Sequence, residues 1–377
     1  MKQFHLYDIL CSTAKKSIEF QKEDGCFPEG HNGPWHDFDT HVRTTAHWAL
    51  TVFKAYEITD EKIFLDATLK ACDYLIKKEQ RPSGYTFYCR TNQTGKNMCN
   101  GLIGQAWAIE PLIFIGESLN VPEYLNVAQK TALLHEYDYR SHLWRNKEIS
   151  GKTMHINPAL NQQVWFAALL MITGRILNDK TLQDCARDFF TNFPARVSFV
   201  EEGLVRHRIE NKSTSLQIIK SKMRLIYQYG KATDADKIKL LSQGYLSFLL
   251  YGLALAYHYS SGEDFWDDIK MKTIISCSVD YIVGRFPFGC GEKTGYRWCY
   301  NPTGIEISYV LQVFQKYLKR EPGEHTISAW LNKQFEYYYD FDKKMMCKNT
   351  EDPVILSSRI YEAARLNNYS LSIFDHG

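Results

Sequence analysis

The sequence predicts an all-α fold in which six consecutive helical hairpins close into a ring, an (α/α)6 toroid. Apolar residues recur with a helical period through twelve segments, and the connections between these segments alternate between long and short. Trp48, Trp107 and Trp165 lie 59 and 58 residues apart, a spacing typical of a repeat with two helices per unit. Because stacked repeats share one core, we expect residues 1–377 to form a single toroid domain.

The predicted helices are delimited by that period and by the turn residues between them. The expected ranges are 3–20, 40–57, 60–79, 101–119, 122–135, 158–178, 180–192, 242–260, 264–284, 303–319, 324–339 and 353–366. The short connections, such as 58–61 and 177–180, consist of polar turn residues. The longest connection, 193–241, is expected to hold an additional helix at 215–229.

The second helix of each pair starts with a recurring capping signal. Asn157-Pro158, Asn301-Pro302 and Asp352-Pro353 each place a capping side chain before a proline, which is tolerated at the first helical position. Together with the alternating loop lengths, this pattern predicts that the second helices line the inside of the ring. Their N-terminal ends would then converge on the long-loop face around a central depression, where we expect any ligand to bind.

The overall composition excludes several classes of protein. The formal net charge is +2 without a polybasic run, which argues against a nucleic-acid-binding surface. Apolar stretches such as 246–256 are shorter than a membrane span, and the first residues lead into a helical pattern rather than a signal peptide. We therefore expect a cytoplasmic protein without membrane insertion. The sequence does not predict its oligomeric state.

The cysteines are expected to be free thiols. There are ten of them at irregular spacing, and Cys89 with Cys99 and Cys290 with Cys299 bracket two loops without CxxC spacing. No histidine-rich segment completes a zinc motif. We therefore predict neither a structural metal nor a cofactor.

The densest polar cluster is the first long loop together with the start of the first inner helix. It contains Asp37 and Asp39, followed by Arg43 and His47, which share one helix face because they are four residues apart. Carboxylates and imidazoles at the cavity end of an inner helix suit acid/base chemistry on a sugar ring, although either aspartate also suits a helix cap. Glycoside hydrolysis needs a second carboxylate, and we predict Glu306, in the first turn of the fifth inner helix, as this partner.

Further residues are predicted to bind the substrate. Arg90, Arg145 and Arg206 occupy similar places in three short strands of the long loops, where guanidinium groups are able to hold a uronate carboxylate. Amides and aromatic rings suit sugar hydroxyls and pyranose faces. The remaining candidates are Trp35, His36, Gln105, Trp107, Gln163 and Tyr296.

The segment Gly104-Gln105-Ala106-Trp107 resembles a motif on an inner helix of unsaturated glucuronyl hydrolases, members of the six-hairpin glycosidase superfamily. The resemblance implies an (α/α)6 toroid across essentially the whole chain, and a carbohydrate-active enzyme in which a loop aspartate donates a proton. Asp37 and Asp39 are the positions that fit this aspartate. The second aspartate of those hydrolases has no counterpart, because Cys99-Asn100 occupies the comparable place.

The most favoured function is therefore a glycoside hydrolase that acts on an oligo- or polysaccharide, which would be its only expected partner. Two alternatives stay open. A polysaccharide lyase or sugar epimerase on the same scaffold would move a proton with His36, His47, His155, His207 or Tyr296. The other is a non-catalytic saccharide-binding protein of polysaccharide biosynthesis.

Overall fold

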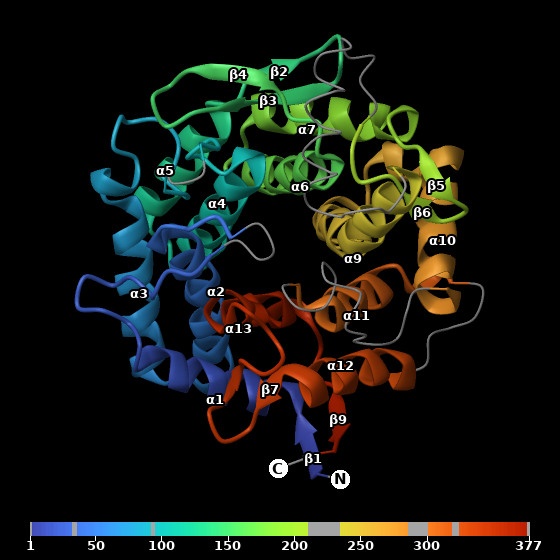
Figure 1. Ribbon diagram of the computed structural model, residues 1–377. Coiled ribbons are helices and arrows are strands. Elements are labelled where there is room, and N and C mark those ends of the chain that lie inside the picture. The colour runs from blue at the N-terminus through green and yellow to red at the C-terminus, as the bar shows by residue number, and fades with distance from the viewer. Residues whose placement is uncertain are drawn as a thin grey trace.

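The computed structural model describes residues 2–31, 36–91, 95–209, 234–285, 301–318 and 324–374. In these ranges the helices form an inner and an outer ring around a common axis (Figure 1). The inner ring consists of α2 (His41–Thr59), α4 (Gly101–Ser118), α6 (Leu160–Ile176), α9 (Asp234–Ser260), α11 (Thr303–Val313) and α13 (Pro353–Ser358), which continues as the 3-10 helix η7 (Arg359–Arg365). The outer ring consists of α1 (Leu6–Ile18), α3 (Lys62–Ile76), α5 (Pro122–Leu133), α7 (Lys180–Asn192), α10 (Ile269–Gly284) and α12 (Glu324–Tyr338).

Contacts between neighbouring inner helices run all the way around the ring. α2 contacts α4, α4 contacts α6, α6 contacts α9, α9 contacts α11, and η7 contacts both α11 and α2. The inner helices are mostly buried on all sides, which explains why α4 and α6 are apolar around nearly their whole circumference. The predicted (α/α)6 toroid is confirmed, while its extent as a single domain over 1–377 stays a prediction.

Short antiparallel sheets lie in the connections and at the chain ends. β1 (Lys2–His5) pairs with β9 (Ser370–Ile373), so the first and last described segments lie side by side (Figure 1). The long connections hold β2 (Tyr137–Asp138) with β3 (Leu143–Lys147) and β4 (Thr153–Ile156), β5 (Phe199–Glu201) with β6 (Leu204–Val205), and β7 (Tyr339–Asp340) with β8 (Met345–Met346). The segments that precede described inner helices also bridge one another: Asp39 pairs with Arg90, and Ala159 with Arg208. These inner helices therefore start on one face of the ring, as predicted.

Most predicted helix bounds hold within a few residues, and the exceptions include both distant and local causes. Residues 3–5 were expected to be helical, but they belong to β1 because β9 is available as a partner. The last inner helix tightens to 3-10 geometry after Ser358. Asp352 caps α13 as predicted by accepting from the N–H of Ile355 at 3.0 Å, whereas Asn157 and Asn301 lie outside the caps assigned to α6 and α11. The additional helix expected at 215–229 lies outside the described residues.

Among the described residues, only α9 is long and apolar enough to span a membrane by length and composition. Its apolar window is 72% buried inside the protein. α9 lies between α6 and α11 in the inner ring, so its hydropathy is accounted for by the core.

Candidate active site

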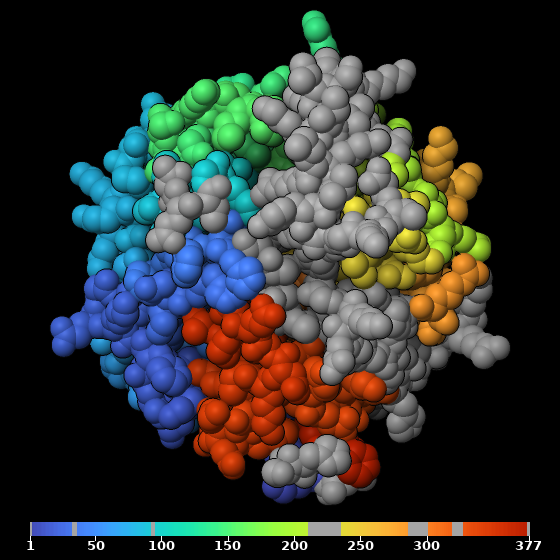
Figure 2. All heavy atoms as spheres, in the orientation of Figure 1, coloured from blue at the N-terminus to red at the C-terminus, as the bar shows by residue number. Residues whose placement is uncertain are grey.

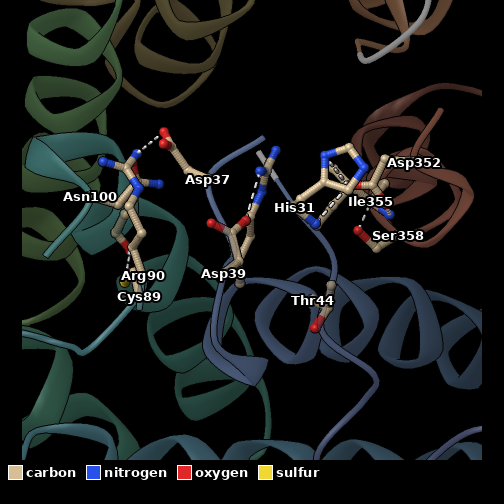
Figure 3. Close-up of polar contacts among 12 residues, drawn as sticks. His31, Asp37, Asp39, Thr44, Cys89, Arg90, Asn100, Asp352, Ile355 and Ser358 are labelled. Carbon is tan, nitrogen blue, oxygen red and sulfur yellow. Dashed lines mark hydrogen bonds and ion pairs between the residues drawn. The ribbon is translucent and has the colours of Figure 1, made fainter. Parts of the chain in front are cut away.

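The candidate site lies where the first long loop enters α2. Residues 37–39 are extended and bridge two neighbouring segments, His31 through Phe38 and Arg90 through Asp39. Figure 3 shows Asp37 and Asp39 between Arg90 and Asn100 on one side and His31 and Asp352 on the other. In the space-filling view of Figure 2, segments from the two ends of the chain adjoin on this face. The backbone N–H of His31 donates to Asp352 at 2.8 Å, which joins the first long loop to the start of α13.

Asp37 is buried and contacts two cations. The Lys96 Nζ lies 2.5 Å and the Arg90 Nη2 lies 3.6 Å from its Oδ2 atom. Arg90 also donates to the Asn100 side chain and so ties this carboxylate to the start of α4. The other carboxylate oxygen, Oδ1, is buried without a hydrogen-bond partner among the described residues, an uncommon state for a buried polar atom.

Asp39 is equally buried, and in the described part of the chain its close cation is Arg43. The Arg43 Nη1 lies 3.1 Å from Asp39 Oδ2, one helical turn along the chain. Burial raises the pKa of Asp39 to about 6, although the charges of Arg43 and Arg90 oppose this shift. The Oδ1 of Asp39 also has no hydrogen-bond partner in the described part of the chain. A carboxyl group with a pKa near neutrality suits a proton donor.

An aromatic cluster lies against Arg43. Its guanidinium carbon is 4.3 Å from the ring centroid of Trp107. His47 stacks on Tyr361 at 4.4 Å and meets Trp107 edge-on at 5.1 Å. Burial, followed by the charges of Arg43 and Arg359, lowers the pKa of His47 well below its usual value, so its imidazole is neutral at pH 7.

Glu306 takes part in a separate, fully buried ion cluster. Its carboxylate accepts from Arg359 Nη2 at 2.7 Å and from Ser247 Oγ at 2.5 Å. Arg359 also binds Glu362. The positive charge of Arg359 also lowers the pKa of Arg43. Glu306 is therefore held by an arginine and a serine, a surrounding that the sequence did not predict.

The two predicted amides have structural roles. The Gln105 side chain accepts from Phe87 N–H at 2.7 Å and donates to the carbonyl groups of Phe87 and Cys99. The Gln163 side chain makes the same kind of contacts, accepting from Trp144 N–H at 3.0 Å and donating to the Trp144 and Asn157 carbonyls. Both side chains are fully buried. The polar groups of both amides are thus occupied by loop backbone, and their contact with a sugar stays a prediction.

The three predicted arginines are not equivalent in space. Arg90 joins the aspartates, whereas Arg145 lies on the β3 hairpin and pairs with Asp138 at 3.2 Å. Arg206 is half-buried beside β6. Although the three arginines occupy similar positions in their loops, the described contacts place their guanidinium groups in different surroundings.

The remaining candidates lie at the rim or outside the described residues. His36 is exposed, with its ring 5.0 Å from that of His31. Trp35 and Tyr296 are outside the described ranges, as are Cys290 and Cys299. Cys89 and Cys99 are buried free thiols, and no group of three metal-ligating side chains occurs among the residues that the structure describes.

Sequence reasoning missed several charged residues that the ring brings to its centre. Lys96 lies in a polar loop that resembles a solvated turn, and Glu110, Arg359, Glu362 and Arg365 lie on inner helices. The sequence did contain a signal for these residues, because they are charged and lie within predicted inner helices. A charged residue that is buried on an inner helix needs a partner on a neighbouring element. Arg365 and Glu110, 2.6 Å apart, are such a pair.

The fold is that of the six-hairpin glycosidase superfamily, as the resemblance implied. An unsaturated glucuronyl hydrolase specific for heparin has a TM-score of 0.62 at 10% identity, covering 95% of this chain and 94% of that chain. A D-mannose isomerase has a TM-score of 0.63 at 13% identity, with 95% of each chain covered. The GH76A α-1,6-mannanase from Salegentibacter sp. HEL1_6 has a TM-score of 0.56 at 13% identity, covering 95% of this chain and 98% of that chain.

Sequence similarity gives a particular family. The chain is 31% identical over 381 residues to archaeal glycosylation protein Q of Haloferax volcanii, and the match covers 97% of this chain and 98% of that protein. The chain therefore belongs to the family of archaeal glycosylation protein Q. No family model matches it.

Proposed function

We propose that this protein is a carbohydrate-active enzyme, and specifically a glycoside hydrolase that uses Asp39 as its proton donor. The observation that carries the proposal is the pair of buried aspartates at the start of α2, each with one carboxylate oxygen that has no hydrogen-bond partner among the described residues. The relative named for glycosylation and the six-hairpin fold support carbohydrate as the substrate class.

The surroundings of the two aspartates favour different roles. Asp39, whose pKa is raised to about 6 by burial, suits protonation of the leaving oxygen. Asp37, held by Lys96 and Arg90, suits the anionic role of activating water or stabilising positive charge on the sugar. Glu306 is the less suitable partner, because Arg359 and Ser247 already occupy its oxygens.

A sugar isomerase or epimerase is the second candidate, and His47 is the observation that favours it. Its neutral imidazole lies between Trp107 and Tyr361, and its Nε2 is buried without a hydrogen-bond partner in the described ranges. A neutral imidazole is able to accept a proton from a sugar carbon. Against this role, a pKa far below neutrality makes it a weak base.

The test is an activity screen of the full chain with three probes: α-1,6-mannotriose, an unsaturated uronide disaccharide prepared from heparin, and D-mannose. Hydrolysis gives new reducing ends, or loss of ultraviolet absorbance with the unsaturated probe. Isomerisation in deuterated water exchanges a carbon-bound hydrogen for deuterium and gives a labelled monosaccharide without cleavage of a glycosidic bond. A deuterium-labelled monosaccharide without any hydrolysis would replace our proposal with a sugar isomerase. Binding of a probe without any product would replace it with a saccharide-binding protein.

Once a substrate is turned over, single variants test the assignment. Asp39→Asn and Asp37→Asn should each lower turnover by about 100-fold or more with an unchanged circular dichroism spectrum, because each removes a group required in the transition state. The matched control is Asp138→Asn, a half-buried aspartate that pairs with Arg145 on the β3 hairpin. Near-native turnover by Asp39→Asn would contradict its role as the acid.

A further inference from the structure

Among the described residues, the Arg43 guanidinium contacts a carboxylate and an indole ring. One side of the guanidinium meets Asp39 Oδ2 at 3.1 Å, and the guanidinium carbon lies 4.3 Å from the Trp107 ring centroid. All three side chains are nearly inaccessible to solvent. In such a desolvated setting a cation over an indole face is stabilised by about 2 kcal/mol, more than over a phenyl ring.

The identity of residue 107 points to this contact rather than to packing alone. The Trp107 Nε1–H is buried and has no acceptor among the described residues. A buried unsatisfied donor costs about 1–3 kcal/mol, so a phenylalanine would fill a purely apolar position at lower cost. The indole ring offers the stronger cation–π partner, which offsets that cost.

The residues around Trp107 fix where its ring lies. A Cβ atom on Gly104 would come within 2.5 Å of the Cys99 carbonyl oxygen, so α4 can approach the preceding loop this closely only with glycine there. Gln105 then binds the same loop through its amide. The Gly-Gln-Ala-Trp segment therefore anchors the start of α4 and sets the indole against Arg43.

We propose that Trp107 is a positioning residue: it holds the Arg43 guanidinium against Asp39 and thereby sets the proton affinity of that carboxyl group without contacting the substrate. The catalytic meaning of this inference rests on the proposed role of Asp39, but the electrostatic coupling itself does not. Without the indole face, Arg43 has one fewer partner, and its ion pair with Asp39 loosens.

Other charged side chains also act on Asp39 and Arg43, and they contribute to the direction in which the Asp39 midpoint shifts. Arg90, from the loop before α4, and Asp352, from the start of α13, act on Asp39 with opposite signs. Arg359, from η7, and Asp352 act on Arg43, again with opposite signs. His47 is neutral in this range of pH. Of these charges, Arg43 has the largest effect in lowering the proton affinity of Asp39. A looser Arg43 is therefore expected to raise the proton affinity of Asp39.

The experiment follows the titration of Asp39 in the full chain without substrate. Carboxyl-carbon NMR of protein labelled in aspartate, with Asp39 assigned by comparison with Asp39→Asn, gives the midpoint directly. In Trp107→Leu the midpoint should rise by up to about one unit, because a looser Arg43 stabilises the Asp39 carboxylate less than it does in the native protein. Trp107→Phe should restore most of the native midpoint. Trp165→Leu is the matched control, because Trp165 is the equivalent buried inner-helix tryptophan but stacks on Phe248 and Tyr251.

A second measurement avoids any change of side-chain size. Growth on 5-fluorotryptophan weakens the π face of all eight tryptophans. The Asp39 midpoint should rise in the fluorinated native sequence and stay constant on fluorination of Trp107→Phe. An unchanged midpoint in both the leucine variant and the fluorinated protein would overturn the positioning role. Failure of the proposed function is a different result, namely full activity of Asp39→Asn, so the two outcomes are distinguishable.

Discussion

At the scale of single residues, the centre of the ring concentrates charge where solvent hardly reaches. Asp37, Asp39 and Arg43 are each less than 5% exposed. The sequence predicted this group because its members lie within a few positions of one another at the start of one helix. It did not predict Lys96 or Arg359, because their partners Asp37 and Glu306 lie 59 and 53 residues away and the contacts depend on how the ring closes. Glu362, three residues from Arg359, was missed because the sequence did not show that Arg359 is buried.

His47 gives a residue-scale prediction about pH. Its pKa in the folded protein is far below 6.5, so under acidic conditions the unfolded chain binds a proton at this residue and the folded chain does not. This residue therefore lowers the free energy of unfolding as the pH falls below about 6.5. His47→Phe keeps the stacking on Tyr361 and removes the titrating group.

The expected result is that His47→Phe becomes more stable relative to the native protein by about 1 kcal/mol on going from pH 7.5 to pH 5.5. Urea unfolding at the two pH values measures this difference. The exposed His155 provides the control variant His155→Phe, which should show no such change. Equal pH dependence in the His47 and His155 variants would contradict a neutral buried imidazole.

At the scale of elements, the inner helices and their loops are joined by a repeated side-chain device. Gln105 of α4 and Gln163 of α6 each bind the backbone of the preceding loop with both ends of the amide. The sequence showed the repeat, since the two glutamines precede Trp107 and Trp165 by the same two positions. It did not show the function of the amides, because a glutamine on an inner helix fits a sugar ligand and a backbone partner equally well.

Replacing either glutamine by leucine should destabilise the fold by about 3 kcal/mol, because several buried backbone groups lose their partners at once. The control is Gln129→Leu on α5, where a half-buried amide makes one hydrogen bond, to Asp179 at 2.8 Å, and where a loss of less than about 1 kcal/mol is expected. Chemical denaturation of the three variants provides the measurement. A loss at Gln105 or Gln163 no larger than at Gln129 would mean that the loops do not depend on these amides.

The observed helices and strands show which elements the periodicity of apolar residues predicts and which it misses. The ranges of α4, α5 and α7 follow from apolar spacing and turn residues, because those signals are local. The N-terminal strand β1 was missed, since residues 2–5 have their partner β9 at the other end of the sequence. Likewise, Asn301 carries a capping signal, yet its side-chain oxygen accepts from Arg359 instead. Local patterns were overruled where a distant segment supplied a stronger partner.

At the scale of the whole molecule, the last inner segment closes the ring with buried ion pairs. Arg359 contacts Glu306 of α11, and Arg365 contacts Glu110 of α4, so η7 is tied to two inner helices. Glu362 adds a third carboxylate to the two arginines. Burial, together with the charges of Glu306 and Glu110, raises the pKa of Glu362 to about 8 despite the opposing charge of Arg359. Glu362 is therefore largely protonated at pH 7 in the folded ring.

This arrangement predicts how the stability of the ring depends on pH. Between about 4.5, the usual pKa of a glutamate, and about 8, the unfolded chain releases the Glu362 proton while the folded chain retains it. The free energy of unfolding contributed by this group therefore falls as the pH rises through that window. Glu362→Gln should remove this loss, because the amide oxygen still accepts from Arg359 and carries no charge.

Urea unfolding at pH 5, 6.5 and 8 measures the difference in free energy of unfolding between Glu362→Gln and the native protein. This gap should favour the variant and widen to a few kcal/mol at pH 8. The control Glu19→Gln, at a side chain 61% exposed, should give a constant difference. A gap for Glu362→Gln that stays constant or narrows with rising pH would show that Glu362 is ionised in the folded ring, and that the three carboxylates and two arginines share their charge in another way.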